Sequence, residues 1–242
     1  MAATSPHSVY VGKYRNGVKP ALPEGVRGIL IHTSDKTLGG ALSPYILRDE
    51  HRCLLENVWQ FSKVYERVDA IRTKLSRFHP DTIVWVWGAE IHVDSKGDLT
   101  PEYWEWREAG MRNPYAVRYP NGFKGRSRCL YSLHQVSPDF YEQLDYIQAR
   151  KTIYCGLYER LAPSHPEFHK LQHLSRKTDL CIIEVDGPDV SWYTDTEIAY
   201  AIEGEVLRLD QTVIDYLVND PSHPFGHGYV IGALLAGLSF GN

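Results

Sequence analysis

Three polar residues recur at helical spacing within one short segment: Glu56, Gln60 and Lys63, with Trp59 beside them. At about 100° per residue, positions i, i+4 and i+7 fall on one face of a helix. A carboxylate can move a proton and an amine can attack a carbonyl-like carbon, so this face could carry acid–base and nucleophilic chemistry. An ordinary solvated polar stripe has the same spacing, and the spacing alone does not separate the two interpretations.

A second polar group follows an apolar run that we predict to be a strand. Glu184, Asp186 and Asp189 come in quick succession and Trp192 follows them. Carboxylates and an aromatic ring on a loop held by a rigid strand are typical of active sites. A turn in which the aspartates bond their own backbone fits equally well.

A glycine-containing loop precedes the last apolar segment, with Phe225, Gly226, His227 and Gly228 leading into Tyr229. Unpaired backbone N–H groups and the helix dipole favour an anion at a helix N-terminus. We therefore expect a phosphate or pyrophosphate here, with a hydrogen bond from His227. The loop by itself is weak evidence, because glycine-rich loops are common.

A basic stretch without acidic residues runs from Ala109 to Pro138 and interleaves cations with tyrosines and phenylalanine. Basic groups neutralise phosphates and aromatic rings stack on unpaired bases. An ordinary basic surface loop is the alternative. If the stretch binds nucleic acid, the expected contacts are Arg118, Lys124, Arg126 and Arg128.

Histidines at His165, His169 and His173 repeat every four residues, a spacing that can bind zinc. The segment is not an HExxH motif, because Glu167 comes one place late, and Pro166 indicates that His165 precedes the helix. We expect no metal and no cofactor.

The elements that must position these residues indicate an α+β fold, predominantly helical, with a few short strands. The predicted strands are Gly28–Thr33, Tyr45–Leu47, Thr82–Trp87, an extended Glu90–Asp94 and Leu180–Val185. The predicted helices are about 54–70, one from Pro101, one from a cap at 137–139 to about 161, one through 169–174, about 195–218 and a final one after 228. Residues 1–26 are predicted to be a surface arm, and 27–242 a single catalytic domain.

Composition limits the classes of protein. The 242 residues carry a formal net charge of -4, so an anionic partner would have to meet a local patch. The four cysteines are unclustered, which favours reduced thiols, and no apolar run is long enough for a signal peptide or a membrane span. We expect an intracellular protein, cytoplasmic or nuclear, without an obligate protein partner.

Taken together and in this order, these pieces resemble the NADAR family. Its helix of the form E-x-x-(aromatic)-Q-x-x-K matches 56–63. Its strand ending in Glu, followed by Asp and Trp, is similar to Glu184, Asp189 and Trp192. Its closing Gly-rich loop is similar to 226–232, with Tyr229 in place of an expected Asn. Trp104 and Arg107 resemble a family Trp/basic pair, one position out of step.

The resemblance implies a hydrolase of N-ribosyl bonds. Family members act on ribosylamino-pyrimidines of riboflavin metabolism, or remove ADP-ribose from the amino group of guanine in nucleic acid. It implies a Schiff base on Lys63, with Glu56 and Asp189 moving protons, and we expect these three to converge on one cleft. The implied substrate-binding residues are Trp59, Gln60, Trp104, Arg107, Asp186, Trp192, Phe225, Gly226, His227, Gly228 and Tyr229.

The expected substrate is ADP-ribosylated guanine, in nucleic acid or as a nucleoside. A riboflavin-intermediate N-glycosidase is the alternative enzyme. A catalytically silent reader of ADP-ribose is the alternative from another class, and the presence of both Glu56 and Lys63 argues against it.

Overall fold

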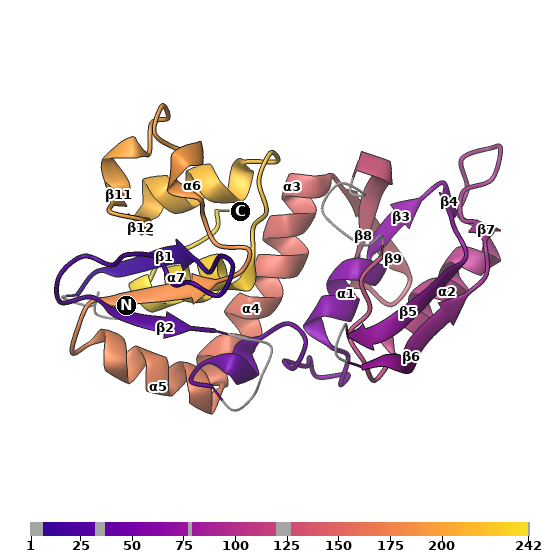
Figure 1. The fold of residues 1–242 in the computed structure, drawn as a ribbon. Coiled ribbons are helices and arrows are strands. Elements are labelled where there is room, and N and C mark those ends of the chain that lie inside the picture. The colour runs from indigo at the N-terminus through magenta and orange to yellow at the C-terminus, as the bar shows by residue number, and fades with distance from the viewer. Residues whose placement is uncertain (1–6, 32–36, 77–78, 120–126, 242) are drawn as a thin grey trace. The chain divides into compact units, whose positions relative to one another are not determined.

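The computed structural model describes residues 7–31, 37–76, 79–119 and 127–241. The chain divides into two compact units (Figure 1). Unit 1 comprises Met1–Ile46 and Arg150–Asn242, and unit 2 comprises Leu47–Ala149. The region 27–242, predicted as one catalytic domain, is thus made of two units, one of which interrupts the other along the chain.

Unit 1 is built on a five-stranded sheet in the order β11-β12-β1-β10-β2. Strand β10 (Leu180–Glu184) is buried throughout and runs parallel to both β1 and β2. The other strands are β1 (Val9–Lys13), β2 (Arg27–Leu30), β11 (Ile202–Glu203) and β12 (Val206–Arg208). Residues 1–26 were predicted to be a surface arm, which is wrong for β1, because Val9 and Val11 are buried inside the sheet.

Helices cover this sheet within unit 1. Helix α7 (His227–Ala236) packs against β1 and β10, as Figure 1 shows. The remaining helical segments are η1 (Gly40–Leu42), the π-helical η3 (Arg150–Cys155), α4 (Gly156–Leu161), η4 (Ala162–Ser164), α5 (Pro166–Ser175), η5 (Val190–Trp192), η6 (Ala199–Ala201) and α6 (Gln211–Asn219).

Unit 2 combines three small antiparallel sheets with short helices (Figure 1). The sheets pair β3 (Lys63–Tyr65) with β8 (Cys129–Ser137) and β9 (Phe140–Leu144), β4 (Arg67–Val68) with β7 (Glu90–Ile91), and β5 (Ile71–Ser76) with β6 (His79–Trp87). The helices are α1 (Leu55–Phe61), α2 (Pro101–Met111) and α3 (Tyr146–Ala149).

An aromatic core holds unit 2 together. The Phe61 ring lies 4.6 Å from that of Trp106 and 5.2 Å from that of Trp85, centroid to centroid. A Cβ placed on Gly110 of α2 would lie 2.0 Å from the Phe61 ring, so glycine is what allows α2 to approach the end of α1. Gly110 therefore lets α2 pack closely against the last residue of α1.

The prediction of a predominantly helical protein is wrong, although the α+β class holds. Helix accounts for 35% and strand for 27% of the residues that the structure describes. Three predicted helices contain strands, including the one expected over about 195–218. The first stops at Phe61, and the apolar residues after it enter β3 and β4 because they pair with β8 and β7. The supposed cap at 137–139 is a hairpin turn, since Ser137 pairs with Phe140.

Two more elements differ from the prediction. The helix expected over about 195–218 is limited to α6, because the residues before it form η6 and the β11–β12 hairpin. Tyr45–Leu47 is not a strand. Residues 32 and 33 of the predicted Gly28–Thr33 strand lie outside the described residues, and the part before them is confirmed as β2. The strands near 82–87 and 180–185 and the helices at 101, 166 and 227 are confirmed.

Helices in the described ranges are too short or too polar to cross a bilayer.

Candidate active site

Glu56, Gln60 and Lys63 form a buried chain of hydrogen bonds in unit 2. Gln60 Nε2 donates to Glu56 Oε1 over 2.9 Å, and Lys63 Nζ donates to Gln60 Oε1 over 2.9 Å. The three side chains are only 3%, 8% and 8% exposed, respectively. The alternative of a solvated polar stripe is therefore excluded for these residues.

Lys63 is not on the helix that carries the other two. Helix α1 ends at Phe61, whose carbonyl accepts a hydrogen bond from Arg107 Nη1 over 2.9 Å. Lys63 is the first residue of β3, where it pairs with Ser132 of β8. The side chain still reaches Gln60, because only one residue separates the helix from the strand.

The environment of the Lys63 amine increases the share of its neutral form. The pKa of Lys63 is lowered from 10.5 to about 8, with burial as the largest cause. The Glu56 carboxylate partly offsets the effect of burial, and the charge of Arg118 adds to it. The amine also lies 4.4 Å from the centre of the Trp59 ring. A buried amine with a lowered pKa is a common starting point for nucleophilic chemistry.

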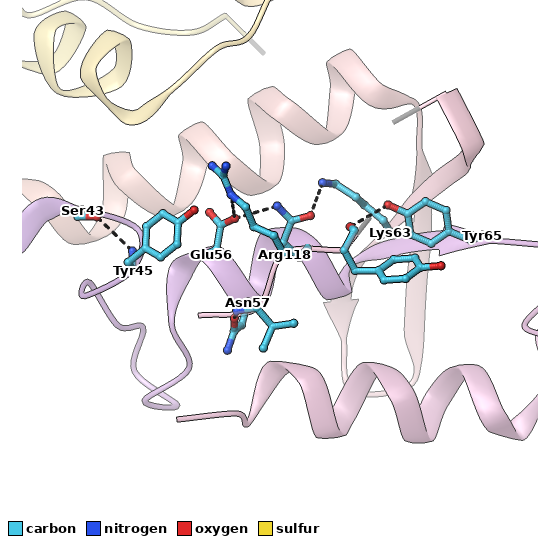
Figure 2. Close-up of polar contacts among 10 residues, drawn as sticks. Ser43, Tyr45, Glu56, Asn57, Lys63, Tyr65 and Arg118 are labelled. Carbon is cyan, nitrogen blue, oxygen red and sulfur yellow. Dashed lines mark hydrogen bonds and ion pairs between the residues drawn. The ribbon is translucent and has the colours of Figure 1, made fainter. Parts of the chain in front are cut away.

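Arg118 comes to this site from the basic stretch. Its Nε donates to Glu56 Oε1 over 3.0 Å, so two donors meet on one carboxylate oxygen (Figure 2). We had expected Arg118 to contact nucleic acid, and no sequence motif indicated its pairing with Glu56. Among the other expected nucleic-acid contacts, Arg128 pairs with Asp69, and Lys124 and Arg126 lie outside the described residues.

The proposed Trp/basic pair contributes to packing in unit 2. Trp104 is 36% exposed, and its ring lies 5.0 Å from that of Tyr141. Arg107 is buried, and its guanidinium lies 5.5 Å from the same tyrosine ring while it binds the end of α1. Arg107 therefore supports the segment that leads into Lys63.

Asp189 belongs to unit 1 and begins η5. Its Oδ1 accepts hydrogen bonds from the Ser191 backbone N–H over 3.3 Å and from its hydroxyl over 2.8 Å, and Oδ2 forms an ion pair with Arg15. The alternative of a turn aspartate bonded to its own backbone is thus realised. Whether Asp189 also meets Glu56 and Lys63 stays a prediction, as does the substrate role of Asp186.

Trp192 lies in a stack of polar and aromatic groups in unit 1. Lys13 Nζ lies 4.3 Å from its ring centre, and the His223 ring stacks on it at 4.2 Å. His223 in turn bonds Asp220 over 2.6 Å. A base that stacked on Trp192 would have to displace one of these two partners.

The predicted phosphate loop surrounds a buried carboxylate. His227 Nδ1 lies 2.8 Å from Glu184 Oε2. A Cβ on Gly226 or Gly228 would lie 2.3 Å or 2.9 Å from the nearest atom of the Glu184 carboxyl group, which explains both glycines. A phosphate at the start of α7 would lie beside the Glu184 carboxyl group, and the repulsion between two negative charges would oppose its binding.

Aromatic packing fills the rest of this loop. The Phe225 ring stacks on Tyr229 at 4.9 Å, and the Arg150 guanidinium lies 5.3 Å from the Phe225 ring. Tyr229 is almost completely buried. In this structure both residues therefore serve the core of unit 1, and their role toward a substrate stays a prediction.

The histidine repeat has local structural partners. His165 precedes α5 and caps it, with Nδ1 accepting from the Glu167 backbone N–H, and His169 Nε2 lies 2.8 Å from the Pro163 carbonyl oxygen. The described ranges contain no group of three or more His, Cys, Asp or Glu residues that could hold a metal ion, and the four cysteines are free thiols.

No family model, no curated protein and no solved structure matches this chain.

Proposed function

We propose that this chain hydrolyses an N-glycosidic bond between ribose and a base, with Lys63 as the nucleophile. The observation that supports this most directly is the buried Lys63 amine, bonded to Gln60 over 2.9 Å and lowered in pKa to about 8. The resemblance of 56–63 to the NADAR helix motif supports the same assignment.

The reaction proceeds by exchange of imines. Ribose attached to the exocyclic amine of a base can ring-open to an imine at C1. The neutral Lys63 amine attacks C1, the base leaves as its free amine, and a Schiff base to Lys63 remains. Water then adds to the Schiff base, which releases the open-chain sugar and restores the amine. Glu56 moves the protons, and Asp189 of unit 1 is proposed as a second acid or base.

The lowered pKa determines how much nucleophile is present. With a pKa of about 8 rather than 10.5, the neutral fraction of the amine at pH 7 rises roughly 300-fold, to about one molecule in ten. Turnover should therefore rise with pH up to about 8, if attack by Lys63 limits the rate.

ADP-ribosylated guanine is the proposed substrate, in nucleic acid or as a nucleoside. The Trp59 ring centre lies 4.4 Å from the Lys63 amine, so we propose that it contacts a substrate held there. The proposed contacts beyond the reacting sugar are the substrate-binding residues of unit 1, among them Trp192 and His227.

One observation favours the second candidate, a ribosylamino-pyrimidine of riboflavin metabolism. Each described arginine of the basic stretch already pairs with a carboxylate: Arg112 with Glu108, Arg118 with Glu56 and Arg128 with Asp69. Paired arginines release fewer counterions on meeting a phosphate backbone, which weakens the argument for nucleic acid. A small substrate needs no such patch.

Release of base from three substrates distinguishes these candidates: a guanine-ADP-ribosylated oligonucleotide, ADP-ribosyl-guanosine and a ribosylamino-pyrimidine. Borohydride added during turnover should reduce the Schiff base and leave a ribose-containing adduct on the wild type. Lys63→Met should lose both turnover and adduct, whereas Lys96→Met, at an exposed turn, should keep both. An adduct that persists in Lys63→Met would identify a different nucleophile. Binding of ADP-ribose without release of any base would favour the silent reader.

A further inference from the structure

Glu56 and Lys63 are linked through an amide whose orientation is dictated by its neighbours. The Glu56 carboxylate in its ionised form can only accept hydrogen bonds, so the Gln60 side chain must turn its NH2 group toward it. Gln60 Oε1 therefore faces Lys63 and accepts from the amine. When Lys63 is neutral, one of its N–H bonds is held by this oxygen, and its lone pair points away from Gln60.

Arg118 holds the other side of the same carboxylate. Its Nε contact over 3.0 Å falls on the oxygen that also accepts from Gln60. Glu56 is 3% exposed, whereas the Arg118 side chain is 47% exposed. A buried carboxylate anchored by a charged donor has a defined position, and charge-assisted hydrogen bonds are the stronger ones.

Asn57 explains how Arg118 reaches Glu56 across more than sixty positions of sequence. Its side chain is completely buried. The amide nitrogen donates to the carbonyl oxygens of Asn113 and Tyr115 over 3.0 and 2.9 Å, and the amide oxygen accepts from the Val117 N–H over 2.8 Å. One side chain of α1 thus clamps the segment 113–117 alongside the helix.

The residues around Arg118 direct it away from the core. Val117 and Tyr119 are buried in the aromatic core of unit 2, at 0% and 3% exposure. The Tyr65 hydroxyl donates to the Tyr119 carbonyl oxygen over 3.2 Å, which fixes the far side of this segment. Arg118 lies between two anchored neighbours and reaches over Glu56 (Figure 2).

We propose that Arg118 is a positioning residue that orients the Lys63 amine through Glu56 and Gln60. Asn57 holds the segment 113–117 in the position from which Arg118 reaches Glu56. This inference rests on the proposed function for its effect on turnover, but not for its effect on Lys63 itself. It replaces the expectation that Arg118 contacts nucleic acid.

The test compares Arg118→Gln and Arg118→Lys with Arg112→Gln, a matched change in an exposed ion pair of the same stretch. The first readout needs no substrate: the pKa of Lys63, measured by NMR titration of its side chain. Because the positive charge of Arg118 lowers this pKa, Arg118→Gln should raise it, Arg118→Lys should largely restore it, and Arg112→Gln should leave it unchanged.

The second readout is turnover. A misplaced amine should cost roughly tenfold or more in rate, equally for a modified oligonucleotide and for free ADP-ribosyl-guanosine, in Arg118→Gln alone. Asn57→Ala should raise the Lys63 pKa in the same direction, although none of its three hydrogen bonds involves Glu56 or Lys63. If Asn57→Ala does not fold, the Arg118 variants still test whether Arg118 positions the Lys63 amine.

The two proposals fail in different ways. If the wild type releases no base from any substrate, the proposed function is wrong, and the NMR titration alone decides on Arg118. A Lys63 pKa that is the same in Arg118→Gln and Arg112→Gln would overturn the positioning role. A loss confined to the oligonucleotide would also overturn it, because Arg118 would then be a nucleic-acid contact.

Discussion

Lys63→Met should change how the stability of the protein depends on pH. The lysine binds a proton up to pH 10.5 in the unfolded chain, but only up to about 8 in the folded one. Between these values the unfolded state holds more protons, so raising the pH through this window stabilises the fold. Below about 8 both states are protonated, and the buried charge destabilises the fold by about 3 kcal/mol, at roughly 1.4 kcal/mol per pH unit.

Methionine has a similar length and no charge, so the stability of the Lys63→Met variant should lack this contribution. The free energy of unfolding of the wild type, minus that of Lys63→Met, should increase by about 2–3 kcal/mol from pH 7 to pH 10. Loss of the amine also leaves the Gln60 oxygen without its donor, which costs about 1–3 kcal/mol. That cost adds the same amount to the stability difference between the wild type and Lys63→Met at every pH, so it does not change how the difference depends on pH.

Urea unfolding followed by tryptophan fluorescence at pH 7, 8, 9 and 10 measures this difference. Tyrosines and cysteines that titrate in the same range are common to both proteins, so their contributions cancel. Lys96→Met removes an exposed lysine and should give a flat difference. A flat difference for Lys63→Met as well would refute the lowered pKa, and with it the enlarged neutral fraction of the amine at pH 7.

Two further predictions concern unit 2. Two glycine substitutions test the packing of α2. Gly110→Ala should destabilise the protein by about 2 kcal/mol in urea unfolding, because its Cβ would overlap the Phe61 ring, whereas Gly88→Ala, with open space around it, should change the stability little. Equal effects of the two substitutions would show that α2 does not pack as described. His92 is completely buried beside Glu90, and burial lowers its pKa below 6.5. The wild type should therefore lose stability as the pH falls below 6.5, and His92→Phe should lose less over the same range. Urea unfolding at pH 7 and at pH 5 measures both losses.

Much of the site segment could be predicted from sequence, but the end of its helix could not. The residues Val64, Tyr65 and Val68 continue the helical spacing of α1 and are buried as that spacing predicts. They are buried as strands, because β8 and β7 offer pairing partners. Such partners lie far along the chain, and periodicity within a short window does not detect them.

The same limitation hid the partners of Glu56. Its spacing from Gln60 indicated a shared face, and the structure shows the hydrogen bond between them. Arg118 was visible only as one cation in a stretch without acidic residues, and nothing in that stretch indicated which carboxylate it would meet. The role of Asn57 is also not visible in the sequence, because an amide on a helix has many possible partners, and its three hydrogen bonds go to backbone groups of a distant segment.

The position of β1 in its sheet has a consequence for the order of events during synthesis. Val9–Lys13 is synthesised before its partners β10 and β12, which lie at 180–184 and 206–208. Until β10 has been made, this apolar strand has no neighbour on either edge. Unit 2 is contiguous in the sequence, and its strands pair with one another within 47–149. The partners of its strands are therefore made before β1 can pair with β10. Between the synthesis of β1 and that of β10, the nascent chain thus carries an apolar strand with two unpaired edges, and such edges are prone to aggregation.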